Sequence, residues 1–263
     1  MIFRVMTVAG SDSGGGAGIQ ADVKTITCLG AFATTAITAV TSQNSVGVDG
    51  IVPLDPSFVS KQMDSILRDI GTDSAKTGML QSGSIIKEVS STFRKFKVDK
   101  IVVDPVMVSK TGARLLRDDS INELQSSLLA IAELVTPNIP EAEILSGMKI
   151  RDVQEMKIAA EKIYNKSGCS VLMKGGHLEN SQKSTDFLLH NGKYSEYSSL
   201  RIETKNTHGT GDTLSSAIAT YRAMGKSMEE SVKLAKEYLQ GAIENSFPMG
   251  KGYGSLCHSW RMR

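Results

Sequence analysis

The sequence has few cysteines and no pattern that would pair them. Its three cysteines, Cys28, Cys169 and Cys257, form an odd and widely spaced set without a CxxC pair. The four histidines also lack the spacing of metal ligands. Neither a disulfide framework nor a zinc site is indicated, and a reducing, cytoplasmic setting is expected.

Long apolar runs and a surplus of one charge are also missing. Apolar runs such as residues 5–9 and 36–40 are far shorter than the ~20 residues of a membrane helix. Polar residues and glycines from position 11 onward interrupt any signal-peptide core, so we expect neither a membrane anchor nor a leader. Lys and Arg (30) nearly balance Asp and Glu (28), and the basic residues are scattered. Nucleic acid is therefore not expected as a partner.

The chain is long enough for one α/β domain over residues 1–263, with 40% hydrophobic content. Strand-like and helix-like stretches alternate along most of it. We expect strands at 2–9, 36–40, 74–80, 100–107 and 170–174, helices at 19–29, 56–70, 85–93, 120–132, 140–145, 153–163 and 228–242, and a hairpin at Asn191-Gly192. This alternation predicts a three-layer αβα sandwich with a mostly parallel central sheet.

A glycine-rich loop, residues 10–18, follows the first strand. Its Gly-Gly-Gly-Ala-Gly string does not match the G-x-G-x-x-G fingerprint of dinucleotide-binding folds. Glycines at the carboxyl end of a strand still let a ligand approach the backbone closely. A substrate cleft is therefore the better interpretation of this loop.

A second loop, residues 206–211, leads into a helix. Apolar residues then fall at the spacing of one helix face: Leu214, Ala217, Ile218 and Tyr221. With glycines on either side of Thr210, backbone N–H groups and the helix dipole favour a bound phosphate. Asp212 would lie beside that phosphate. The alternative is that Asp212 only stabilises the first turn of the helix.

Polar residues collect at the expected strand ends: Asp12, Gln43, Lys76, Asp104, Asn138, Glu141, Lys174 and the loop 209–212. The carboxyl ends of parallel strands meet at one edge of a sheet, so one cleft could hold them all. This set suits phosphoryl transfer, which needs cations, backbone donors and a base. There is no Walker A string, which leaves phosphates to the loop amides and a lysine.

Several longer motifs resemble one enzyme family. They are residues 8–22, Thr41-Ser42-Gln43-Asn44, Lys76-Thr77-Gly78-Met79-Leu80, Asp104-Pro105-Val106-Met107, residues 136–141, Lys174-Gly175-Gly176-His177 and His208-Gly209-Thr210-Gly211-Asp212. The motifs resemble those of the hydroxymethylpyrimidine/phosphomethylpyrimidine kinases of thiamin biosynthesis, which belong to the ribokinase-like kinases. They extend in order to the glycine-rich tail at 250–254, so the resemblance covers nearly the whole chain.

The resemblance implies an ATP- and Mg²⁺-dependent enzyme. Its substrates would be 4-amino-5-hydroxymethyl-2-methylpyrimidine and then the monophosphate of that alcohol. By position in the motifs, Gly10, Asp22 and Gln43 would contact the pyrimidine, and Met79 and Val106 would flank the ring. A homodimer is also expected.

The resemblance assigns the phosphate side of the site as well. Asn138 and Glu141 match an Asn-x-x-Glu element that organises Mg²⁺ and the triphosphate, Asp104 would assist through metal or water, and Lys174 would contact the nucleotide. Gly209, Thr210 and Gly211 become the anion hole, with Asp212 as the general base.

The chain departs from the family pattern at Asp212. Many of the pyrimidine kinases have cysteine there, whereas pyridoxal and sugar kinases of the superfamily have aspartate. A carboxylate can deprotonate an alcohol, but its charge would meet the incoming monophosphate in the second reaction. Pyridoxal kinase is therefore the alternative activity, and a sensor that keeps the pocket without transferring phosphate is the alternative class.

Single residues also have simpler interpretations. Asp104 and Lys174 could form an ordinary ion pair at strand ends, and Asp22 could face solvent. Gln43 could make only a loop hydrogen bond, and Met79 could belong to the core. Lys76 and His208 have no role assigned from the sequence.

Overall fold

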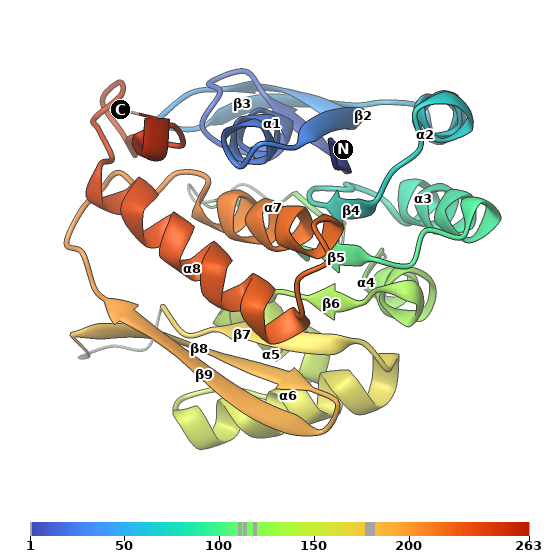
Figure 1. The fold of residues 1–263 in the computed structure, drawn as a ribbon. Coiled ribbons are helices and arrows are strands. Elements are labelled where there is room, and N and C mark those ends of the chain that lie inside the picture. The colour runs from blue at the N-terminus through green and yellow to red at the C-terminus, as the bar shows by residue number, and fades with distance from the viewer. Residues whose placement is uncertain (1, 110–111, 113–114, 118–119, 177–181, 263) are drawn as a thin grey trace.

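The structure is a computed structural model that describes residues 2–109, 112, 115–117, 120–176 and 182–262. His177, the last residue of one motif, lies outside them. The described strands form one sheet in the order β3-β2-β1-β4-β5-β6-β7-β8-β9 (Figure 1). The strands are β1 (Arg4–Asp12), β2 (Phe32–Gln43), β3 (Val48–Pro53), β4 (Ser74–Thr77), β5 (Ile101–Val103), β6 (Leu134–Val135), β7 (Ser170–Lys174), β8 (Lys183–His190) and β9 (Lys193–Leu200).

The centre of the sheet is parallel and its two edges are antiparallel. Strands β2, β1, β4, β5, β6 and β7 pair in parallel, β3 pairs antiparallel with β2, and β8 and β9 extend β7 as an antiparallel hairpin. The hairpin turns at Asn191 and Gly192, both with positive φ, as the Asn-Gly pair predicts.

Helices cover both faces of this sheet (Figure 1). The longer ones are α1 (Gly18–Cys28), α2 (Pro56–Asp69), α3 (Gly83–Phe96), α5 (Ile139–Ser146), α6 (Val153–Ser167), α7 (Thr210–Ala223) and α8 (Met228–Glu244). Alternate strand residues face the two layers: Met6 and Val8 pack with α2, α3, α5 and α6, whereas Val5 packs with α1, α7 and α8. The predicted three-layer αβα architecture is therefore confirmed.

Several elements differ from the sequence prediction. Strand β4 ends at Thr77 and not at 80, and β6 was not among the expected strands. Strand β3 was not expected, because Gly50 and Pro53 are residues that strands usually avoid. Strand β5 ends at Val103 and not at 107, since Pro105 has no N–H for the sheet. The helix expected at 120–132 is instead α4 (Ile121–Glu123), a π-helical turn at Leu124–Leu128 and a 3₁₀ turn at Leu129–Ile131.

None of the helices described in the structure has both the length and the apolar character needed to cross a bilayer.

Candidate active site

The polar residues predicted at strand ends, with the exception of the buried Lys76, line one cavity. Its volume is about 990 Å³, and its walls come from the carboxyl ends of the parallel strands, the start of α7 and one side of α8. The predicted site residues among its lining are Gly10, Gln43, Met79, Asp104, Val106, Asn138, Glu141, Lys174, Gly209, Thr210, Gly211 and Asp212. The structure thus brings together all the predicted site residues except Asp22.

The loop before α7 ends in a backbone conformation that needs glycine. Gly209, the N-cap of α7, has φ +84°, and a Cβ there would lie 2.0 Å from the carbonyl oxygen of Gly16. No side chain caps this end of the helix. The first N–H groups of a helix have no partner within it, so this start of α7 at the cavity is suited to bind an anion.

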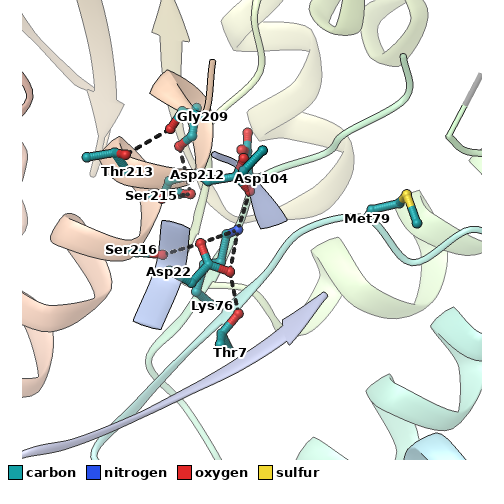
Figure 2. A network of polar contacts seen from close by, with 12 residues as sticks. Thr7, Asp22, Lys76, Met79, Asp104, Gly209, Asp212, Thr213, Ser215 and Ser216 are labelled. Carbon is teal, nitrogen blue, oxygen red and sulfur yellow. Dashed lines mark hydrogen bonds and ion pairs between the residues drawn. The ribbon is translucent and has the colours of Figure 1, made fainter. Parts of the chain in front are cut away.

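Asp212, in the first turn of α7, shares a buried lysine with another carboxylate (Figure 2). The Lys76 ammonium lies 2.9 Å from Asp212 Oδ1 and 2.8 and 3.0 Å from the two oxygens of Asp22. Burial alone would raise the pKa of Asp212, but the charge and hydrogen bond of Lys76 outweigh it and hold that pKa below its ordinary value. Asp212 is therefore ionised at neutral pH, as a proton acceptor must be.

Asp22, which the resemblance placed against the pyrimidine, lies behind the cavity wall. Its side chain is fully buried, and it accepts hydrogen bonds from Thr7 Oγ1 (2.5 Å) and Ser216 Oγ (2.6 Å) besides those from Lys76. Both of its oxygens are thus occupied by protein donors. Asp22 is not among the residues that line the cavity, and it does not face solvent either.

A second group of charges surrounds Lys174, at the end of β7. Its ammonium lies 2.9 Å from Asp104 Oδ1 and 3.9 Å from Glu141 Oε2. Burial raises the pKa of Glu141 to about 7, against the opposing charge of Lys174. Asp104 and Lys174 therefore form an ion pair, as their 2.9 Å distance shows, and both residues line the cavity.

Asn138 orients Glu141 by capping α5. Asn138 Oδ1 accepts from the Glu141 N–H at 2.9 Å, while Glu141 Oε2 accepts from the Asn138 N–H at 2.8 Å. This reciprocal capping box fixes the Glu141 side chain at the head of α5. The Asn-x-x-Glu motif therefore has a local structural reason as well as a place at the cavity.

The ion pair of Asp104 and Lys174 lies next to Gly211, in the first turn of α7. A Cβ on Gly211 would lie 3.0 Å from Asp104 Oδ2 and 3.5 Å from Lys174 Nζ. A phosphate held by the first turn of α7 would therefore be close to Lys174.

Asp104 and Glu141 could take part in holding a divalent cation. Among the described residues, no group of three or more His, Cys, Asp or Glu side chains forms a metal site. Mg²⁺ is usually bound by one or two carboxylates together with substrate phosphates and waters. Two carboxylates beside a phosphate-binding loop fit that donor set.

Two apolar side chains, Met79 and Val106, are among the residues that line the cavity. Gly10 and Met79 face each other so closely that a Cβ on Gly10 would lie 2.6 Å from Met79 Cε. Gln43 lines the cavity as well. A flat ring could lie between these apolar side chains, with the amide of Gln43 hydrogen-bonded to the polar atoms at its edge.

His208 was left without a role by the sequence, and the structure shows what it contacts. Its Nε2 lies 2.8 Å from Asp12 Oδ2 and 3.4 Å from Gln43 Nε2. Asp12 also accepts from the N–H groups of Gly14, Gly16 and Ala17, which closes the glycine loop around the carboxylate. His208 thus ties the loop before α7 to the glycine loop after β1.

Sequence reasoning missed the wall beyond Lys174. This wall includes the stretch 200–205 after β9, and Leu239 and Ile243 of α8. No motif marks these residues, because the α8 side chains read as one face of an amphipathic helix. To find this wall, one would have to know that α8 packs beside β9, which the sequence does not show.

Comparison with known proteins agrees with this geometry. Residues 12–257 match the sequence model of the family described as phosphomethylpyrimidine kinase. The hydroxymethylpyrimidine/phosphomethylpyrimidine kinase of Bacillus subtilis is 40% identical over 98% of this chain and 95% of that protein. The thiamine biosynthesis bifunctional protein ThiED of Geobacter sulfurreducens is 46% identical over 97% of this chain, which spans 52% of that longer protein.

Solved structures show the same fold. The pyridoxal kinase of Staphylococcus aureus, in complex with AMP-PCP and pyridoxal, superposes with a TM-score of 0.92 at 33% identity, covering 100% of this chain and 96% of that one. The ribokinase-like fold implied by the sequence motifs is therefore confirmed. Together with the match over residues 12–257, these relatives show that the chain is a kinase of the phosphomethylpyrimidine kinase family.

Proposed function

We propose that the chain transfers the γ-phosphoryl group of ATP to the hydroxymethyl group of 4-amino-5-hydroxymethyl-2-methylpyrimidine, and then phosphorylates the resulting monophosphate. The observation that supports this most is that Asp212, at the uncapped start of α7, opens into the same cavity as Asp104 and Lys174. A proton acceptor, an anion-binding helix start and a cationic side chain are the parts that transfer to an alcohol requires.

In the first transfer, Asp212 would accept the hydroxyl proton while the hydroxyl oxygen bonds to the γ-phosphorus. The bond from that phosphorus to the β,γ-bridging oxygen breaks, and ADP leaves with the electron pair. Backbone N–H groups of Gly209, Thr210 and Gly211 would donate to the charge on the transferred group. The proton then passes from Asp212 to solvent.

Asp104 and Glu141 would hold Mg²⁺, and Lys174 would contact the nucleotide phosphates. When bound, the cation supplies neutralisation of the phosphate charge. Asn138 would keep Glu141 in place through the capping box.

The aminopyrimidine would lie between Met79 and Val106, against the backbone of Gly10. Gln43 can both donate and accept, which an aminopyrimidine edge requires. For Asp22 we propose an indirect part, because it supports Lys76 from outside the cavity.

Pyridoxal is the second candidate substrate. The superposing Staphylococcus aureus kinase was solved with pyridoxal. The family resemblance of the sequence motifs also implies that pyridoxal kinases have an aspartate where this chain has Asp212. Pyridoxal also offers an aromatic ring with a hydroxymethyl group, so the same cavity could accept it.

The direct test is ATP consumption by the purified chain with Mg²⁺ and one acceptor at a time: the aminopyrimidine alcohol, its monophosphate, pyridoxal or ribose. Turnover of the first two supports the proposal. A strong preference for pyridoxal would replace the substrate, and turnover of none would favour a sensor that binds without transfer.

We also infer that residues 1–263 act as one kinase domain, as a homodimer in the reducing cytoplasm and without a nucleic-acid partner. One sheet spans the chain, and Cys28, Cys169 and Cys257 are free thiols. On the β2–β3 edge, Val40 and Val52 pair across the strands and are both exposed, which supports a partner there. The mass of the particle in solution, measured by light scattering, tests the dimer.

A further inference from the structure

A buried lysine stands behind the proposed base, at a place that no ligand in the cavity reaches. The Lys76 side chain is fully buried and does not line the cavity, whereas the Asp212 side chain is 15% exposed and does. An ammonium has three N–H donors, and here they meet Asp212 Oδ1 and both oxygens of Asp22. Every contact of this charge is thus with the protein and none is left for substrate.

Asp22 and Gly78 keep that lysine in place. Each oxygen of Asp22 accepts from Lys76 and from one hydroxyl, of Thr7 or Ser216, so β1, α1 and α7 all hold the carboxylate (Figure 2). A Cβ on Gly78 would lie 2.9 Å from Lys76 Nζ. The absence of a side chain at Gly78 therefore leaves just enough room for the ammonium.

We propose that Lys76 is a positioning residue, which keeps Asp212 ionised and oriented toward the alcohol and offsets the charge of Asp212 when the acceptor is itself a phosphate. This inference rests on the proposed function, because it takes Asp212 as the base. In the first transfer Lys76 keeps Asp212 ionised, and in the second it offsets the charge of Asp212.

The charge balance behind the cavity wall explains the first part. Asp22 and Asp212 are two carboxylates that face one ammonium. Without Lys76 they would face each other with no cation between them, and the pKa of Asp212 would no longer be held below its ordinary value. Once protonated, Asp212 cannot accept the hydroxyl proton. The other titratable groups whose charge acts on Asp212 or Lys76 are Asp104, Lys174, His208 and His258.

The chemistry of the second acceptor explains the second part. A phosphate monoester has its second pKa near ~6, so at neutral pH its attacking oxygen carries no proton. The oxygen bonds to the γ-phosphorus, the bond to the bridging oxygen breaks, and ADP leaves without any proton transfer to the protein. Asp212 then contributes only a negative charge beside a negative acceptor, and Lys76 offsets it.

The test is the variant Lys76→Met of the full chain, assayed with the alcohol and with its monophosphate from pH 5.5 to 9. With the alcohol, the rate of the variant should fall by about threefold or more between pH 7 and pH 5.5, where the unmodified chain keeps its rate, since the cation that holds the pKa of Asp212 below its ordinary value is gone. With the monophosphate, kcat/KM should fall about tenfold or more at the alkaline end of the range, mainly through KM, because Asp212 is ionised there without its cation. Arg222→Met is the matched control: Arg222 lies at the other end of α7 and pairs with Glu133, so this variant should keep both profiles.

A variant whose rate with the alcohol does not fall between pH 7 and pH 5.5, together with equal losses for both acceptors, would make Lys76 a structural residue and overturn the inference. If Lys76→Met does not fold, the double variant Lys76→Met/Asp22→Asn is the test, because it removes both buried charges of the pair. The double variant leaves Asp212 without its cation, so its rate with the alcohol should also fall between pH 7 and pH 5.5. A profile like that of the unmodified chain would contradict us.

Failure of the proposed function is recognised separately, on the unmodified chain. If the unmodified chain phosphorylates only pyridoxal, the substrate assignment fails, and the fall in rate between pH 7 and pH 5.5 is measured with pyridoxal. If it phosphorylates no alcohol, the function itself fails and the inference with it.

Discussion

His208 Nε2 lies 2.8 Å from Asp12 Oδ2, across 196 positions of sequence. This contact joins the loop that begins α7 to the glycine loop that follows β1. Replacing His208 by leucine should raise KM for the alcohol about tenfold, because the two loops would no longer hold the acceptor and the phosphate in register. The free energy of unfolding should fall by about 1–2 kcal/mol, as measured by urea denaturation.

The control for this variant is His190→Leu. His190 Nδ1 bonds to Ser170 Oγ at 2.7 Å, away from the cavity lining. It should lose similar stability with KM unchanged. An equal rise of KM in both variants would show that general loosening, and not the contact with Asp12, is responsible.

Asp212→Asn separates the two reactions. The amide cannot accept a proton, so transfer to the alcohol should fall by about a hundredfold or more, while ADP binding measured by calorimetry is kept. Transfer to the monophosphate needs no base and should change by less than about tenfold. Asp73→Asn, which breaks an ion pair with Arg4 near the start of β1, should leave both rates unchanged. Equal losses in the two reactions would argue against a base.

Gly209→Ala should remove activity and destabilise the fold. Its Cβ would lie 2.0 Å from the Gly16 carbonyl oxygen, and its φ of +84° strains any other residue. Gly225 offers a matched control, since it has φ +81° but open space around its Cβ position. Gly225→Ala should cost about 1 kcal/mol of stability and no activity. Thermal melting and turnover assays together distinguish strain from steric clash.

His258 should make stability depend on pH. It is buried beside Thr213 in the first turn of α7, and burial lowers its pKa to about 4. His258 therefore takes up a proton near pH 6.5 in the unfolded chain, but only near pH 4 in the folded chain. The free energy of unfolding should fall by about 1.4 kcal/mol per pH unit as pH drops from 6.5 toward 4.

The variant His258→Gln, followed by urea unfolding at several pH values, should flatten that slope. A slope that stays the same would assign the effect to other groups. Asp22 is the competing group with a raised pKa, of about 6, owing mainly to burial. Its protonation favours the folded state as pH falls, so it acts in the opposite direction.

Most of the fold could be predicted from local patterns. The Asn-Gly hairpin, the Asp55-Pro56 start of α2 and the alternation of strands and helices follow from turn chemistry, capping and periodicity. The prediction failed for the segment 120–132 because its apolar spacing does not distinguish a regular α-helix from the π-helical turn at Leu124–Leu128 and the 3₁₀ turn at Leu129–Ile131.

The candidate site was predictable where residues follow strands directly. Asp104 and Lys174 could be expected at one edge of the sheet because strand ends meet there. The place of Asp22 could not, since one turn of helix decides whether a side chain meets the cavity or the core. The partners of Lys76 also depend on tertiary packing of α1 and α7 against β4, which no local pattern records.

The cavity lined by Asp212 is also lined by Gly10 after β1 and by Ile243 of α8. If both transfers take place there, ADP must be exchanged for ATP between them. The monophosphate then competes with unreacted alcohol for the same acceptor site. Time courses started with excess alcohol should then show a lag before diphosphate accumulates. A high concentration of the alcohol would thus delay the formation of the diphosphate.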